Sequence, residues 1–112
     1  MKIGVSATGG SMDAAVEPRL GRCPFFVIVD SETMRFEAFT NPATDAAGGA
    51  GPQTVQPFAS RGAQVVLTGQ VGPKAQTAFD AAGIEVVTGI SGKVRQVVEE
   101  YLKSRGCAIT EQ

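Results

Sequence analysis

Three glycine tetrads of the form Gly-x-x-Gly stand directly before segments that favour helix formation. They are Gly48-Gly49-Ala50-Gly51, Gly69-Gln70-Val71-Gly72 and Gly89-Ile90-Ser91-Gly92. Proline, a favoured first helical residue, follows the first two tetrads. A glycine-rich turn that leads into a helix exposes backbone N–H groups and the positive end of the helix dipole. If the three turns meet at one edge of a sheet, they predict a pocket suited to an anion.

Basic and soft side chains accompany these turns. The basic residues near the predicted edge are Arg19, Arg22, Lys74 and Lys93. A lysine in the first turn of a helix is unfavourable for the dipole, so a bound anion is a reasonable hypothesis for Lys74 and Lys93. The loop at residues 9–22 adds Gly9, Gly10 and Met12, the last as a loop residue or an apolar lid over the pocket.

Helix dipoles alone are too weak to hold such a ligand. Each helix terminus contributes roughly 0.3–1 kcal/mol toward a nearby anion, whereas micromolar affinity requires about 8 kcal/mol. Backbone hydrogen bonds, basic side chains and apolar contact must supply the rest. This mixture favours a bulky, polarizable anion over a small hydrated one.

Several catalytic chemistries are excluded by missing residues. The chain has no histidine, which removes imidazole as metal ligand or general base. No tetrad is followed by the Gly-Lys-Ser/Thr of a Walker loop, and no Gly-x-Gly-x-x-Gly fingerprint follows the first strand. That strand, KIGVSAT, also lacks the carboxylates of a two-metal nuclease. We therefore predict a binding protein and no enzyme.

Length and charge set broader limits. The 112 residues predict one domain over residues 1–112, with a loose tail at 106–112. A net charge of −1 argues against affinity for nucleic acid or for a membrane surface. The N-terminus lacks the apolar region of a signal peptide, so we expect a cytoplasmic protein, and we expect a monomer. The two cysteines, Cys23 and Cys107, form no zinc pattern, and Cys23 is the one candidate metal ligand.

The periodicity of apolar residues predicts five strands and three helices. The predicted strands span residues 2–8, 24–30, 35–41, 64–68 and 84–87, and the predicted helices span 52–61, 73–82 and 92–105. In the first strand Gly4 and Ser6 keep one face small, so that a helix can pack closely. Pro57 lies inside the first helix and predicts a kink or a late start there.

The order of these elements predicts an α/β fold. The first three strands form a meander, and right-handed crossovers place strands four and five parallel to strand one. The result is a five-stranded mixed sheet of order 3-2-1-4-5, with strand two antiparallel and helices on both faces. The three tetrads and the loop at residues 9–22 then lie at the carboxyl ends of the parallel strands, where open α/β sheets bind ligands.

Two sets of motifs resemble one protein family. Residues 17–30, EPRLGRCPFFVIVD, are similar to the N-terminal motif of the dinitrogenase iron–molybdenum cofactor biosynthesis family. The order and spacing of Gly69, Gly72-Pro73, Ala82-Gly83-Ile84 and Gly89 with Gly92 and Val94 match it as well. Leu20 stands where the family usually has phenylalanine, and Cys23 stands where alanine is frequent.

The resemblance implies a fold and a cargo. It implies a three-layer domain with a ribonuclease H-like motif that carries, stores or inserts iron–molybdenum cofactor or its precursors. One small member holds a molybdenum–copper sulfide cluster without covalent protein ligands. By this resemblance we expect a molybdenum–copper or iron–molybdenum type cluster, and partner proteins encoded in the same operon. The absence of histidine favours binding by backbone, charge and shape.

Other interpretations stay open from the residues alone. The tetrads are also what tight strand-to-helix turns require. Arg19 and Arg22 would serve equally to fix the first loop, and Cys23 at the start of a buried strand suits a small core residue. As functions, a small-anion or nucleotide-binding module and a protein-interaction domain are the alternatives.

Overall fold

The computed structural model describes residues 1–20, 23–40 and 50–104, without the side chains of residues 50–54. Five strands and three helices follow one another along the chain. They are β1 (Lys2–Ala7), β2 (Phe25–Asp30), β3 (Phe36–Thr40), α1 (Ala50–Ser60), β4 (Ala63–Leu67), α2 (Pro73–Ala82), β5 (Glu85–Val87) and α3 (Val94–Ser104). Each predicted element is present, and every end lies within two residues of its predicted position.

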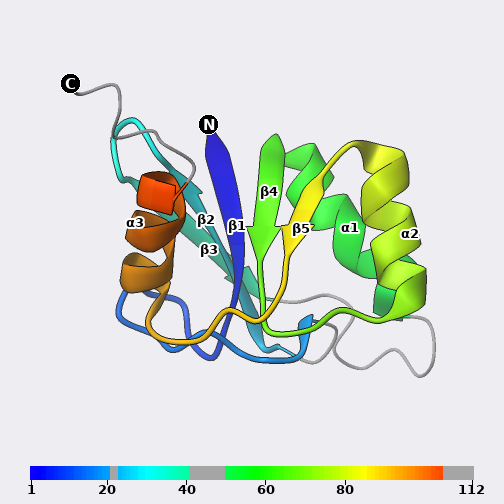
Figure 1. Ribbon diagram of the computed structural model, residues 1–112, viewed down its shortest axis with the longest axis horizontal. Coiled ribbons are helices and arrows are strands. Elements are labelled where there is room, and N and C mark those ends of the chain that lie inside the picture. Colours follow the sequence, from blue (N-terminus) through cyan, green and yellow to red (C-terminus); the bar gives the residue numbers. More distant parts are fainter. Residues whose placement is uncertain (21–22, 41–49, 105–112) are drawn as a thin grey trace.

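The strands form one open sheet of order β3-β2-β1-β4-β5 (Figure 1). β1 pairs antiparallel with β2 and parallel with β4, while β2 and β3 are antiparallel and β4 and β5 are parallel. This is the predicted order with the predicted direction of strand two. The α/β fold class is thereby confirmed.

The sheet is the middle of three layers, and each face has its own apolar core. α3 covers one face, and α1 and α2 cover the other (Figure 1). Successive side chains of β1 point to opposite faces of the sheet. Ile3, Val5 and Ala7 pack in the core beneath α3, which we call the α3 cluster. The second core contains the rings of Phe26, Phe58 and Phe79, and the centroids of the first two rings lie 4.5 Å apart.

Gly4 allows α1 to approach the sheet closely. A β-carbon at Gly4 would stand 2.5 Å from two ring atoms of Phe58. Phe58 is fully buried and contacts the rings of both Phe26 and Phe79, so it has little room to move away. The expectation that one face of the first strand stays small for a helix is confirmed at this position.

The expectation of a late-starting first helix is wrong. α1 begins at Ala50, two residues before the predicted start, and continues through Pro57 to Ser60. Val55, Pro57 and Phe58 are buried. Burial of this apolar face outweighs the hydrogen bond that a proline removes from the helix.

The side chain of Arg61 anchors the end of α1 to β3. Its guanidinium carbon lies 3.9 Å from the ring centroid of Phe39, and its Nε lies 3.4 Å from the Glu37 carboxylate. Its Nη1 donates to the Pro57 carbonyl at 3.3 Å.

No helix in the described part of the chain combines the length and apolar character that a membrane span needs.

We predict that Gly4→Ala destabilises the fold by about 1–3 kcal/mol, because the new methyl group overpacks the core against Phe58. Urea unfolding followed by circular dichroism measures this loss. Gly72→Ala is the matched control, since no atom lies within 4 Å of a β-carbon there and its φ is an ordinary −75°. Equal stability of Gly4→Ala and the parent chain would contradict the close-approach explanation.

Candidate functional site

The carboxyl ends of the parallel strands lie at one edge of the sheet, and all three helices begin at this edge (Figure 1). β1, β4 and β5 end there at Ala7, Leu67 and Val87. This arrangement brings the second and third tetrads to the same edge, as the topology predicts. Whether the edge is open to a ligand depends on what the loop after β1 does.

Residues 14–20, which we call the strap, run across this edge. The first part of the strap pairs with the end of β1, since the Glu17 N–H donates to the Ser6 carbonyl at 2.9 Å. The second part pairs with the second tetrad, where Gln70 donates to Pro18 at 2.7 Å and Leu20 donates to Gln70 at 3.3 Å. The protein's own backbone therefore fills part of the expected pocket.

The strap and the residues just before it also cap α3. The N–H groups of Val94 and Arg95 donate to the carbonyls of Ala14 and Met12 at 3.0 and 2.9 Å. The first amides of α3 thus have partners within the chain. These two amides are therefore not free to bind a ligand, as the exposed helix terminus expected from the sequence would be, and Lys93 lies exposed beside them.

The N-terminus of α2 is different. The helix begins at Pro73 after the extended residue Gly72, and no side chain among the described residues caps it. Lys74 in its first turn is exposed, and so is Arg19, which the strap holds beside Gln70. No carboxylate among the described residues forms a salt bridge with the side chain of Arg19 or Lys74, but the Glu17 carboxylate accepts from the Arg19 backbone N–H at 3.4 Å. The start of α2 therefore carries the exposed Lys74, while Arg19 is held beside Gln70, just before the helix, with the Glu17 carboxylate close to its backbone.

The glycines of the second and third tetrads have structural reasons of their own. A β-carbon at Gly69 would stand 2.6 Å from the Cα and carbonyl oxygen of Pro18, so only glycine lets the strap lie this close. Gly89 and Gly92 adopt positive φ angles of 75° and 122°, which favour glycine. The interpretation that these tetrads are tight turns that need glycine is supported at three of their four glycines, Gly69, Gly89 and Gly92.

The first tetrad lies only partly within the described residues. Gly48 and Gly49 are outside them, as are Arg22 and Cys107. α1 begins at Ala50, so Gly51 belongs to the first turn of the helix and not to the turn before it. The prediction that the whole tetrad forms a turn ahead of the helix is therefore wrong for Ala50 and Gly51, which are helical.

Two predicted contact residues are buried in the core. Met12 has 3% of its surface exposed and packs in the α3 cluster, so its side chain is no lid over the edge. Cys23 is fully buried, and its thiol donates to the Leu20 carbonyl at 3.1 Å. Gly9 and Gly10 lie in the loop after β1, where a β-carbon at Gly10 would stand 3.4 Å from Ala38.

Sequence reasoning missed two buried hydroxyls at this edge. Ser6 and Thr68 have no exposed surface, and their oxygens lie 2.8 Å apart. Ser6 also lies 2.8 Å from the Glu17 carbonyl oxygen. The available signal was a serine and a threonine at the ends of two apolar strands, but the serine was interpreted only as a small residue.

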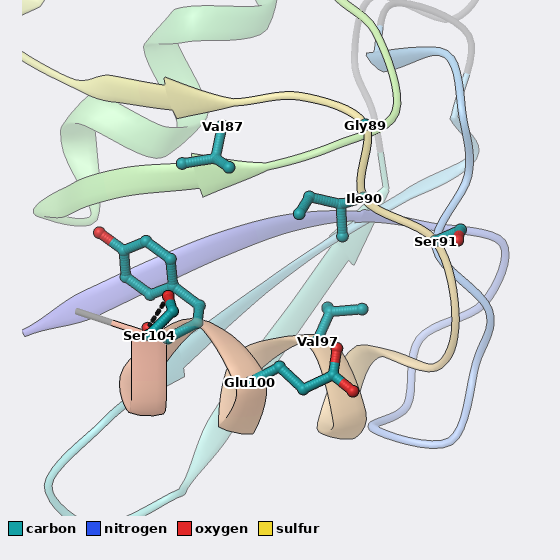
Figure 2. Close-up of a pocket in the computed structure, with 8 residues that line it drawn as sticks. Val87, Gly89, Ile90, Ser91, Val97, Glu100 and Ser104 are labelled. Atoms are coloured by element: carbon teal, nitrogen blue, oxygen red, sulfur yellow. Dashed lines mark hydrogen bonds between the residues drawn. The ribbon is translucent and has the colours of Figure 1, made fainter. Parts of the chain in front are cut away.

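Two hollows lie near the tetrads. A cavity of about 340 Å³ lies between the end of β5 and α3 and is bordered by Gly89 of the third tetrad (Figure 2). A shallow, open depression of about 500 Å³ lies on α2 and is lined by Pro73, Lys74, Thr77, Ala78 and Ala81. The second hollow is continuous with the uncapped helix terminus, and its lining is mainly apolar.

The described residues offer no ready set of metal ligands. No group of three or more histidine, cysteine, aspartate or glutamate side chains gathers among them in a way that would hold a metal ion. Backbone amides, exposed cations and apolar surface are what this end of α2 has to offer. Such a set recognises an anion by hydrogen bonds and charge.

Comparison with known proteins identifies relatives with this fold. The orange protein of Desulfovibrio gigas, solved in its apo form, is 44% identical, with a TM-score of 0.88 over 93% of this chain and 88% of that one. A Thermotoga structure described as a candidate NifB protein of the DUF35 family is 28% identical, with a TM-score of 0.80 over 93% and 89% of the two chains. An uncharacterized protein of Methanocaldococcus jannaschii is 26% identical over 93 residues, which cover 80% of this chain and 79% of that one.

The profile of the family described as "Dinitrogenase iron-molybdenum cofactor" matches residues 1–104. This match spans nearly the whole chain and includes both motif sets on which the resemblance was based. It supports a role connected with a molybdenum-containing metal cluster. The protein belongs to the dinitrogenase iron–molybdenum cofactor family.

Proposed function

We propose that the protein binds and carries a molybdenum-containing metal–sulfide cluster, of the molybdenum–copper or iron–molybdenum type, without catalysing a reaction on it. Family membership and the similarity to the orange protein support the class of cargo. One observation carries the choice of place. No described side chain caps the start of α2, its first turn carries the exposed Lys74, and the exposed Arg19 pairs with Gln70 just before this helix.

The available donors suit a preassembled anionic cluster. The chain has no histidine, and Cys23 is buried with its thiol donating to a backbone carbonyl. A cluster that needed several protein thiolates would find no such set among the described residues. The sulfides of a thiomolybdate-type anion, in contrast, accept hydrogen bonds from amides and cations. The proposed binding therefore requires no covalent protein ligand.

Individual residues take separate roles in this proposal. Arg19 and Lys74 supply positive charge, and Gly72, with no atom within 4 Å of a β-carbon, lets the backbone approach the cargo, while Gly69 lets the strap lie close beside it. The shallow apolar depression on α2 supplies apolar contact. Gly9, Gly10, Arg22, Gly48, Gly49 and Gly51 stay as sequence-based candidates for the remaining walls. Met12, Gly89, Gly92 and Lys93 leave the proposed site, because they serve the core or the α3 turn.

A small phosphorylated anion is the second candidate, because the same uncapped terminus would also bind phosphate. The absence of a Walker lysine and of strand carboxylates weakens this alternative. A thermal-shift screen with nucleotides and phosphorylated metabolites separates the two. A carrier of metal–sulfide clusters should show no shift with these compounds.

We expect the purified protein to take up a cluster when it is treated anaerobically with tetrathiomolybdate and copper(I) or iron(II). Gel filtration followed by metal analysis and visible spectroscopy should show molybdenum and the second metal eluting with the protein. Serum albumin treated in the same way controls for nonspecific adsorption. The absence of retained molybdenum with both second metals would reject the proposed function.

We expect Lys74→Ala and Arg19→Ala each to weaken cluster retention about three- to tenfold, because each removes a charge-assisted contact with the anion. Both side chains are exposed, so thermal stability should change little. Arg22→Ala carries the same expectation from the sequence. Retention is measured as the molybdenum left after graded dialysis.

Lys103→Ala is the control for this experiment, because it removes a lysine near the carboxyl end of α3, far from the proposed site. Its retention should equal that of the parent protein. Equal losses in Lys103→Ala and Lys74→Ala would show that only net charge matters and would reject the α2 terminus as the binding place.

A further inference from the structure

Two fully buried hydroxyl groups lie directly behind the strap. Ser6 is in β1 and Thr68 follows β4, and these two strands are adjacent and parallel. Their oxygens lie 2.8 Å apart, and the Ser6 oxygen lies equally far from the Glu17 carbonyl oxygen. Neither hydroxyl belongs to the residues that we propose to contact the cargo. A buried polar pair of this kind needs an explanation.

The direction of these hydrogen bonds follows from the donors available. A serine hydroxyl carries one hydrogen, and a carbonyl oxygen can only accept. Ser6 must therefore donate to Glu17, so the hydrogen between the two hydroxyls comes from Thr68. The three groups form one directed chain, from the Thr68 hydroxyl through the Ser6 hydroxyl to the Glu17 carbonyl.

Glu17 stands where the strap changes partner. Before it, the strap follows β1, with Ala7 opposite Val16 in an antiparallel bridge. After it, the strap follows the second tetrad, with Arg19 and Gln70 in a parallel bridge. At this change of partner the Ser6 hydroxyl binds the Glu17 carbonyl, so a side chain holds the backbone where the ladder is interrupted.

Thr68 connects this chain of bonds to the rest of the edge. Its N–H donates to the Val87 carbonyl at 3.0 Å, and its own carbonyl accepts from Ile90 at 3.1 Å. The Thr68 hydroxyl is therefore held by backbone on the β5 side while it points to β1. These hydrogen bonds therefore fix the position of the strap relative to β1, β4 and β5.

We propose that Ser6 and Thr68 are positioning residues, which hold the strap so that Arg19 stays beside the second tetrad. The part that concerns the cargo rests on the proposed function. The part that concerns the strap does not, because the hydroxyl chain can be tested without any cluster. Neither residue contacts the cargo in this proposal.

Amide hydrogen exchange on the protein without cluster tests the strap. In Ser6→Ala and Thr68→Val, exchange at Gln70 and Leu20 should accelerate about tenfold or more, since these N–H groups form the ladder beyond Glu17. Exchange at Val66, in the middle of β4, should stay unchanged. Unchanged exchange at Gln70 and Leu20, or acceleration equal to that at Val66, would overturn the proposal.

Conservative variants separate the hydroxyl from general packing. Thr68→Ser keeps a donor and should retain the slow exchange of Gln70 and Leu20. Thr88→Val removes an exposed hydroxyl at the same edge and is the matched control. If Thr68→Ser, which keeps the hydroxyl, exchanges as fast as Thr68→Val, which loses it, altered packing at this position and not the hydrogen bond accelerates the exchange, and the proposal fails.

Cluster retention tests the link to the cargo. Ser6→Ala and Thr68→Val should lose molybdenum about as fast as Arg19→Ala, and Thr68→Ser should retain it like the parent. Adding Arg19→Ala to Ser6→Ala should cause no further loss, because both changes act through one contact. Accelerated exchange with normal retention would overturn this link. Failure of the parent protein to retain any cluster would reject the proposed function. The positioning of the strap would then be decided by the hydrogen-exchange measurement alone.

Discussion

The face of β1 beneath α1 must stay small, and much of the structure depends on this constraint. Gly4 leaves room for the ring of Phe58, which would stand 2.5 Å from a β-carbon at that position. Two residues along the same face, Ser6 is small enough for the buried layer and still carries a hydroxyl, which holds the Glu17 carbonyl. The small residues on this face of β1 therefore determine both how closely α1 packs on the sheet and where the strap runs.

The strap changes what the carboxyl edge can offer to a ligand. Open α/β sheets usually bind their ligands in the crevice at this edge. In this protein, backbone carbonyls from Met12 and Ala14 already satisfy the first amides of α3. The start of α2 remains, which no described side chain caps, with Lys74 exposed in its first turn and Arg19 exposed beside Gln70. A cargo at this place would be held by amides, charge and apolar surface, which agrees with a cluster that arrives already assembled.

The fold was predictable from the sequence because its signals are local and strong. Alternation in β1, the apolar run of β2 and the helical spacing in α2 and α3 each identify an element, and crossover handedness then leaves few sheet orders. The start of α1 was not predictable from Pro57 alone. Burial of Val55 and Phe58 against the sheet decided it, and that burial is a property of the packed layers.

By itself the sequence determined the fold class, the family, and the lack of any histidine for metal ligation. It also brought the second and third tetrads to one edge. Only the tertiary structure decided which of their amides are available, and that Met12 is buried in the core. The physical reason is distance along the chain. Ser6 and Thr68 are 62 residues apart, and no local pattern indicates which donor reaches which acceptor across such a span.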